Sequence, residues 1–295
     1  MDYDTFKWSL LEEVKGKTGD GVQVRLHRIP KENGLKTDAI TLAAQGGGLT
    51  PAMAVRPLYE SYASGKETLA GIALRLASKH QLFVRETAEG GGRPPSLEEV
   101  SDRIYVRLMN AELNEARLGR LPSVRFLDLA AVFYIRLDLT ASFDAMILIN
   151  DDDAFRWQVS ARELMTLALR NTMRDHKPAL IPMRQILSQT EEEEADEEVP
   201  VMYVLTNNVR WHGAAAILYP QLLEKVAGKT GRRFFVLPSS VHETIILPDD
   251  LGYSTAMLES LVQEVNRTEV RPEDFLSNRV YRYDAESGGL TFACD

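Results

Sequence analysis

The irregular order of strand-type and helix-type segments is the feature that most constrains this fold. Two strongly apolar β-type segments, LDLAAVFYIRLDL (127–139) and AMILIND (145–151), follow one another in the middle of the chain. A regular alternation of strands and helices would indicate a parallel α/β sheet. This order instead predicts an α+β fold, with mixed or antiparallel sheets and helices packed on them. We expect two subdomains, residues 1–95 and 96–295.

The N-terminal region has clear periodicity of both kinds. Residues 21–28 alternate apolar and polar side chains and are expected to form a hairpin with residues 39–44, leaving His27 exposed on the polar face. A helical region at 56–80 is expected to break near 64–65. An amphipathic helix is predicted before the hairpin by the spacing of Phe6, Leu10, Leu11 and Val14.

Two capping boxes predict helix starts further along the chain. Ser96 and Glu99 begin a helix expected to run to about Asn114, and Ser160 and Glu163 begin a second one. Beyond residue 200 we expect strands at 201–207, 232–238 and 243–248, a helical region at 213–227 and a terminal hairpin at 279–293. A last helix should bury the stripe Met257, Leu258, Leu261, Val262 and Val265.

The negative charge is concentrated in one segment. The formal net charge is −9, and EEEEADEE (Glu191–Glu198) carries seven of these charges, so the rest of the chain is nearly neutral. A run of this kind repels itself and predicts a solvated loop at 188–199; the alternative is a docking site for a basic partner. Nucleic acid is disfavoured as a partner, although Arg117, Arg120 and Arg125 leave room for a small basic patch.

Cysteine content and hydropathy indicate a cytoplasmic protein. Cys294 is the only cysteine, which excludes an intrachain disulfide and a thiolate zinc site. No apolar run approaches the roughly 18 residues of a membrane helix. The N-terminal residues mix charges with apolar side chains, so they lack the core of a signal peptide. Neither a membrane nor a secreted location is therefore expected.

The Gly-Lys-Thr triplets at 16–18 and 228–230 do not predict a phosphate loop. Such a loop needs a further glycine, and Leu11 and Leu223 occupy those positions. Both triplets also follow helices, whereas a phosphate loop precedes one, so we interpret them as helix ends with basic residues. The glycines at 46–48 and 90–92 lack the spacing of a dinucleotide fold. No cofactor is expected.

No metal site is expected either. His242 and Glu243 begin like a zinc-protease motif, but Ile246 stands where the second histidine is needed. Asp151–Asp153 could hold a hard cation, and a polar turn after a strand explains the triplet without one. His80, His176 and His212 have no partners at ligand spacing, and each is expected to be a surface or satisfied structural residue.

The stretch LPSSVHETIILPDD (237–250) gathers serines, a histidine and a glutamate within five positions. In a strand, Ser240 and His242 would share a face roughly 6.6 Å apart, too far for an easy nucleophile–base contact. No glycine elbow surrounds either serine, so we interpret the stretch as a structural strand whose hydroxyls satisfy backbone groups. The alternative is a polar site across the fold, whose catalytic candidates are Ser240, His242, Glu243, His212 and Asn207.

Several of these segments resemble a known family. PSSVHETIILPDD, VRFLDLAAVFY, YVLTNNVRWHGAAAILYPQLLEKVA and EVNRTEVRPEDFLSNRVYRYD are similar to an uncharacterised domain family of gut Firmicutes, along nearly the whole chain. The order of elements is more faintly similar to the YtpQ-like proteins of Bacilli. The resemblance implies a frequent association with mobile elements and supplies no catalytic residues.

Two hypotheses for function follow. The first is a cytoplasmic, non-enzymatic binding or accessory protein of a bacterial mobile element or its host, with a protein as its partner, because no catalytic or cofactor motif is complete. The alternative is a hydrolase or transferase that uses a polar site around His242 and Glu243. The sequence does not indicate an oligomeric state.

Overall fold

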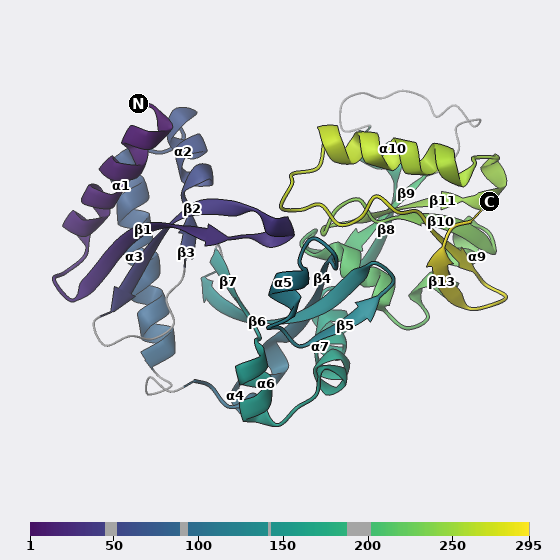
Figure 1. The fold of residues 1–295 in the computed structure, drawn as a ribbon, viewed down its shortest axis with the longest axis horizontal. Coiled ribbons are helices and arrows are strands. Elements are labelled where there is room, and N and C mark those ends of the chain that lie inside the picture. Colours follow the sequence, from purple (N-terminus) through teal and green to yellow (C-terminus); the bar gives the residue numbers. More distant parts are fainter. Residues whose placement is uncertain (45–51, 89–93, 141–142, 188–201, 295) are drawn as a thin grey trace. The chain divides into compact units, whose positions relative to one another are not determined.

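The computed structural model describes residues 1–44, 52–88, 94–140, 143–187 and 202–294. The chain divides into two compact units. The first unit contains Met1–Glu99 and Arg136–Met146, and the second contains Val100–Ile135 and Ile147–Asp295. Helices and antiparallel sheets build both units, which confirms the α+β class (Figure 1). That residues 1–95 and 96–295 are separate subdomains stays a prediction.

A three-stranded antiparallel sheet, in the order β1-β2-β3, forms the first unit together with helices. The elements in chain order are α1 (Tyr3–Lys17), β1 (Val22–Pro30), η1 (Glu32–Gly34), β2 (Lys36–Ala44), β3 (Ala52–Ala54), α2 (Val55–Ala63) and α3 (Leu69–Ala88). The expected hairpin is therefore confirmed as β1 and β2, and His27 is exposed on it. The expected helical break is confirmed between α2 and α3, and α3 continues past His80.

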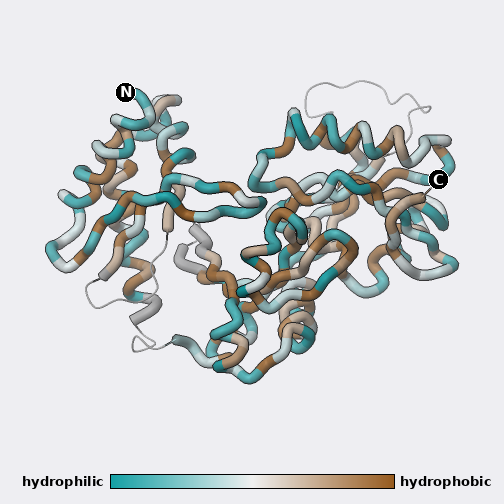
Figure 2. The backbone as a smooth tube through the Cα atoms, in the orientation of Figure 1, coloured by the Kyte–Doolittle hydropathy of each residue, from teal (hydrophilic) through white to brown (hydrophobic). Residues whose placement is uncertain are grey.

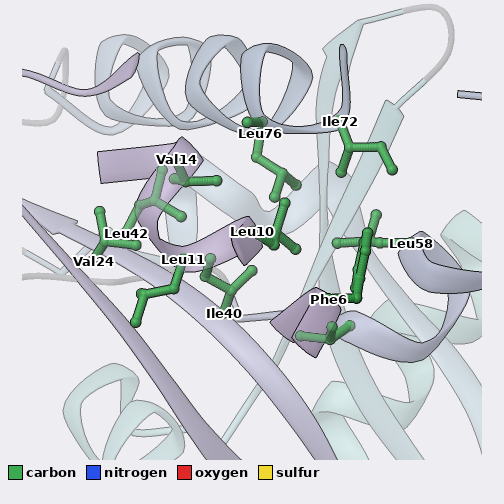
Figure 3. Close-up of a cluster of buried hydrophobic side chains, with 12 residues drawn as sticks. Phe6, Leu10, Leu11, Val14, Val24, Ile40, Leu42, Leu58, Ile72 and Leu76 are labelled. Atoms are coloured by element: carbon green, nitrogen blue, oxygen red, sulfur yellow. The ribbon is translucent and has the colours of Figure 1, made fainter. Parts of the chain in front are cut away.

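The core of the first unit lies where the helices meet the sheet (Figure 3). The four residues predicted to face inward from α1 are all buried there: Phe6, Leu10, Leu11 and Val14. They pack with Val24, Ile40 and Leu42 from the sheet and with Leu58, Ile72 and Leu76 from α2 and α3. Fully burying one such aliphatic or aromatic side chain contributes about 1.5–3 kcal/mol, so the α1 stripe is a main source of stability in this unit.

A second antiparallel sheet has β6 at its centre, with β4 and β5 as neighbours and β7 also paired to β6. The elements are α4 (Leu97–Val100), η2 (Ser101–Arg103), β4 (Ile104–Asn110), α5 (Glu115–Leu118), β5 (Ser123–Phe126), β6 (Leu129–Thr140) and β7 (Phe143–Leu148). The two apolar β-type segments are thus confirmed as β6 and β7. Arg136–Met146, from the far end of β6 to β7, belong to the first unit.

The helix predicted from Ser96 to about Asn114 is wrong beyond its first turn. The capping box itself is present, since the Ser96 N–H donates to Glu99 Oε2 at 2.7 Å and the Glu99 N–H donates to Ser96 Oγ at 3.4 Å. The chain then becomes β4, every residue of which is buried. β-Branched and aromatic residues pack well as a strand covered on both faces, and this burial outweighs the local helix signal.

A six-stranded antiparallel sheet, in the order β13-β12-β10-β11-β9-β8, dominates the second unit. Its strands are β8 (Pro178–Pro182), β9 (Tyr203–Asn207), β10 (Arg233–Leu237), β11 (Thr244–Pro248), β12 (Tyr281–Asp284) and β13 (Gly289–Phe292). The remaining helices of the second unit are α6 (Asp151–Trp157), α7 (Ala161–Asp175), α8 (Met183–Leu187), η4 (Gly213–Leu218), α9 (Leu222–Thr230), η5 (Asp249–Leu251) and α10 (Thr255–Thr268). The terminal hairpin is confirmed as β12 and β13.

The strand β11 is covered on both faces, as its continuous apolar run predicts. Leu247 is buried in the cluster that α10 forms with the sheet, whereas Ile246 is fully buried on the opposite face. Pairing with β10 and β9 places β11 in the interior of the sheet.

The stripe predicted to be buried on α10 is partly wrong. Leu258 and Val262 are buried against the sheet, but Met257 is 57% exposed and Leu261 is 50% exposed. Residues four apart stack along one line of a helix, and only the line through Leu258 and Val262 faces the sheet. Hydrophobic and hydrophilic residues accordingly alternate along α10 in Figure 2.

A carboxylate joins the two sheets of the second unit. Asp128, in the turn between β5 and β6, accepts a hydrogen bond from Ser277 Oγ at 2.6 Å and another from the hydroxyl of Tyr281. Burial, followed by the hydrogen bond to Asp128 and the charge of that carboxylate, raises the pKa of Tyr281 far above its usual range. The phenol therefore stays a hydrogen-bond donor and holds β12 against the β5–β6 turn.

Local signals at the helix ends are borne out with one exception. The Gly-Lys-Thr triplets lie at the ends of α1 and α9, and the second capping box begins α7. Asp151–Asp153 form the first turn of α6, capped by Asn150, so the prediction of a polar turn is wrong.

Some predictions fall outside the described residues. These concern the acidic segment 188–199, the glycines 46–48 and 90–92, and residues 89–93 of the connection. No helix in the described part is long and apolar enough to span a bilayer.

Candidate functional site

The residues Pro238–Glu243 form the loop between β10 and β11, so the prediction that Ser240 and His242 share a strand face is wrong. The Oγ of Ser240 accepts hydrogen bonds from the backbone N–H groups of His242, at 3.1 Å, and Glu243, at 3.3 Å. A serine bonded to its own following amides forms a turn that competes with the ladder of a sheet. The expected role of the hydroxyl in satisfying backbone groups is confirmed, within a turn.

A segment before β12 holds this loop from one side. The N–H of Val241 donates to the carbonyl of Asp274 at 2.8 Å, and the N–H of Leu276 donates to the carbonyl of Ser239 at 3.0 Å. Ser240 also forms an isolated bridge with Phe275. These backbone contacts fix the loop between β10 and β11 and place the Asp274 side chain beside it.

A second loop, after β9, is closed by the side chain of Asn207. Its Nδ2 donates to the carbonyl of Trp211 at 2.8 Å, and its Oδ1 accepts from the N–H groups of Val209 and Trp211 at 3.2 and 3.3 Å. Arg210 and His212 adopt left-handed backbone angles, with φ of 52° and 51°. Asn207 is therefore used to shape the loop that presents Trp211 and His212.

The two loops are clamped together at Gly213. A Cβ at this position would lie 2.2 Å from Thr206 Oγ1 and 2.4 Å from the carbonyl oxygen of His242. Thr206 Oγ1 itself donates to that carbonyl at 2.8 Å. Only glycine allows the chain to approach so closely, so the position of His212 relative to His242 is set by the backbone.

His242 is engaged at both nitrogens. Its Nδ1 accepts a hydrogen bond from the backbone N–H of His212 at 3.3 Å, and its Nε2 lies 3.4 Å from Asp274 Oδ1. An imidazole that accepts at Nδ1 carries its proton at Nε2, where it points to the carboxylate. Ser240 Oγ donates instead to Glu243 Oε1, at 3.4 Å, so the serine and histidine side chains are not hydrogen-bonded to each other.

The ring of His212 is buried and has no polar partner in the part of the chain that the structure describes. The residue is 7% exposed, and neither Nδ1 nor Nε2 has a hydrogen-bond partner among the described residues. Its ring lies 4.1 Å from that of Trp211 and 5.8 Å from those of Tyr134 and His242. Burial, and then the positive charge of Arg107, holds the pKa of His212 well below its ordinary value. The imidazole is neutral at neutral pH.

A row of aromatic rings continues from His212 into the interior of the second unit. Tyr134 lies 5.7 Å from Tyr105, and Tyr105 lies 5.1 Å from His176. The hydroxyl of Tyr105 donates to Asp175 Oδ2 at 2.7 Å. His80, in the first unit, and His176 are both buried, so a surface role for them and for His212 is wrong.

All five residues proposed from the sequence lie at these two loops: Asn207 is the last residue of β9, and His212, Ser240, His242 and Glu243 lie in the loops themselves. Their assignment to catalysis stays a prediction. Sequence reasoning missed Asp274, Thr206 and Trp211. No short motif links Asp274 to His242, whereas Trp211 stands next to His212 and could have been noticed.

Two cavities among the described residues of the second unit are lined by residues outside these loops. One, of about 500 Å³, is lined by charged residues around Arg233 and Asp249. Another, of about 550 Å³, lies around Tyr219 and Tyr283. Among the residues that the structure describes, no group of three or more histidine, cysteine, aspartate or glutamate side chains is placed to hold a metal ion.

Comparison with known proteins identifies the family but not an activity. No curated protein and no solved structure matches the chain. Residues 3–285 match the model of a family described as a family of unknown function, DUF5688. This match covers almost the whole chain and includes both loops of the candidate site. The chain therefore belongs to the DUF5688 family.

Proposed function

We propose that this chain is a non-enzymatic binding or accessory protein. The observation that supports this function is that the polar side chains around His242 are already engaged in contacts within the fold. A nucleophilic serine needs a base in hydrogen-bond contact, and a general base needs a nitrogen free to take a proton. Ser240 Oγ instead accepts two backbone amides, and His242 is engaged by the His212 N–H and by Asp274.

The cellular setting is part of the same proposal. One cysteine, Cys294, is typical of a protein that folds in the reducing cytoplasm of a bacterium. The sequence resemblance to domains carried on mobile elements supports a role for a mobile element or its host, and a protein is the partner we propose.

One observation favours a second candidate function, hydrolysis or group transfer. His212 is a neutral, buried imidazole with two unpartnered nitrogens among the described residues, and its ring is stacked on that of His242. A neutral histidine in a desolvated site is suited to accept a proton from a substrate. In this second function His242 and Asp274 would orient the loop that carries the base.

The two functions are distinguished by a screen of the purified chain on ester, amide and phosphate substrates. The variants are Ser240→Ala, His242→Ala and His212→Asn, with the exposed His27→Ala as the matched control. The binding function predicts no turnover by the purified chain or by any of these variants. Turnover that is lost in the three site variants and retained in His27→Ala, all folded by melting temperature, would establish the enzyme. Crosslinking and capture of the tagged chain in its native host should recover a stoichiometric protein partner.

A further inference from the structure

The second unit contains a cavity that the residues of the candidate site do not line. It has a volume of about 550 Å³ and lies between β5, the chain from η4 to α9, and the β12–β13 hairpin. Small-molecule sites usually enclose roughly 300–1,000 Å³, so this cavity has the size of a site for a small organic ligand.

Apolar and aromatic side chains form most of the cavity lining. Ile217, Tyr219, Leu223 and Tyr283 line it and are themselves at most 9% exposed as residues. The ring of Tyr283 is stacked on Phe234 at 4.9 Å, and the hydroxyl of Tyr219 donates to the carbonyl of His176 at 2.8 Å. Both rings are therefore held in place by contacts with the interior, so the apolar surface is formed before any ligand arrives.

The cavity has one acidic side chain and no basic one among the residues that line it, and the acid is Glu224. This carboxylate makes no salt bridge with a described residue. Burial, followed by the negative charges of Glu224 and Asp284, raises the pKa of Tyr283. Because the charge of Glu224 acts on the phenol of Tyr283, this charge lies close to the aromatic surface of the cavity.

The N-terminus of α9 carries a partial positive charge that opposes the negative charge of Glu224. Glu224 lies in the first turn of this helix, whose N-terminus carries a partial positive charge of about half an elementary charge. A full carboxylate charge exceeds that of the helix end, and the charge of Asp284 adds to it. The potential at the rim therefore favours a cation over an anion.

We propose that this cavity binds a small organic cation, a primary amine attached to an apolar or aromatic body. The body would pack on Ile217, Leu223 and the two tyrosine rings, and the ammonium would donate a charge-assisted hydrogen bond to Glu224. Tyr283 offers a further ring face to the cation. Gln221, held by a left-handed backbone (φ 59°) just before α9, adds an amide to the cavity lining.

This ligand site goes beyond the proposed binding function and does not depend on it. A cavity for an amine and a surface for a protein partner use different contacts. Failure of amine binding would leave the capture of a protein partner unchanged, and failure of the capture would leave amine binding unchanged.

The test is calorimetric titration of the full chain with phenethylamine, and with 3-phenylpropionate as the matched anion. We expect phenethylamine to bind with a dissociation constant of about 1 mM or tighter, as small fragments do in preformed pockets, and the anion not to bind. Glu224→Gln should weaken the affinity for the amine on the order of tenfold, the effect of one charge-assisted hydrogen bond at an exposed site. Glu264→Gln, an exposed carboxylate of α10, is the control and should change nothing.

The position of the ligand is read from methyl NMR. Phenethylamine should shift the δ1 methyl of Ile217, which lines the cavity, and leave that of Ile72 in the core of the first unit unchanged. Glu224 is exposed, so Glu224→Gln should keep the wild-type melting temperature. Absence of saturable amine binding at millimolar concentration, or equal affinity for wild type and Glu224→Gln, overturns the proposal. Binding of the anion as tightly as the amine overturns it as well.

Discussion

The backbone N–H of His212 donates a hydrogen bond to Nδ1 of His242 across 3.3 Å, while the two imidazole rings stack at 5.8 Å. Together with the hydrogen bond from Thr206 Oγ1 to the His242 carbonyl, this contact ties the loop after β9 to the loop between β10 and β11. It also leaves one histidine fully engaged and the other without a polar partner among the described residues. The stability and the chemistry of the site both depend on how firmly this pair is held.

Gly213→Ala should destabilise the protein by about 1–3 kcal/mol, the usual cost of overpacking a buried position. The new methyl would lie 2.2 Å from Thr206 Oγ1 and 2.4 Å from the His242 carbonyl, and the latter is backbone that cannot turn away. The measurement is the free energy of unfolding by urea.

Gly228→Ala is the matched control for this change. No atom lies within 4 Å of a Cβ at Gly228, which is inside α9, so alanine there should stabilise the helix by about 0.5–1 kcal/mol. Equal effects of the two substitutions would show that the loops are not clamped at Gly213.

The stability of the protein should fall as the pH falls below about 6.5, because of His212. The unfolded chain has a histidine of ordinary pKa, 6.5, whereas burial keeps the pKa in the folded state well below that value. Between the two values the unfolded chain binds more protons, so acid favours unfolding. The contribution is complete above pH 6.5 and is lost as the pH falls toward the folded pKa.

The measurement is the melting temperature at ~pH 7 and ~pH 5 for the wild type and for His212→Asn, whose side chain tolerates the left-handed backbone. The acid-induced decrease should be smaller in His212→Asn and unchanged in His27→Asn. A remaining part is expected from His80, whose pKa burial also lowers. An identical decrease in His212→Asn and the wild type would contradict the prediction.

Ile246→Ala should cost about 2–5 kcal/mol, the penalty for truncating a buried aliphatic side chain. Ile246 is fully buried on β11, between its paired neighbours β10 and β9. Leu261→Ala is the control from the apolar stripe of α10, and because Leu261 is half exposed it should change the free energy of unfolding by less than about 1 kcal/mol. A large loss of stability in Leu261→Ala would show that this face of α10 contacts another part of the chain or another molecule.

Local periodicity was enough to predict much of the fold. The residues Phe6, Leu10, Leu11 and Val14 lie on one face of any helix, so their burial follows from spacing alone. The helix expected after Ser96 failed because β4 is buried on both faces, and that burial depends on the rest of the second unit. The exposure of Leu261 likewise depends on how much of α10 the sheet covers.

Five residues of the candidate site could be named from the sequence, but their arrangement could not be predicted. Ser240 was expected in a strand, yet its hydroxyl bonds to the next two amides, and the loop is held by the segment at Asp274. The contacts with the segment at Asp274 join parts of the chain that are remote in sequence and carry no periodic signal. The close approach at Gly213 is of the same type, because it involves Thr206 and the carbonyl of His242.

His242→Ala decides between a structural and a catalytic histidine. The His242 side chain is 28% exposed, and its removal leaves the N–H of His212 without its acceptor. An unsatisfied donor of this kind costs about 1–3 kcal/mol, less than the upper part of the range expected for Ile246→Ala. A structural role therefore predicts a measurable loss of stability, with the phenotype in the native host retained wherever the variant is folded. A catalytic histidine predicts the opposite result, with stability retained and the phenotype lost, because active-site groups are often held at a cost in stability.

The experiment measures melting temperature and host phenotype for His242→Ala beside the exposed His27→Ala. A variant that melts like the wild type and abolishes the phenotype, while His27→Ala retains it, would establish the loop as a functional site.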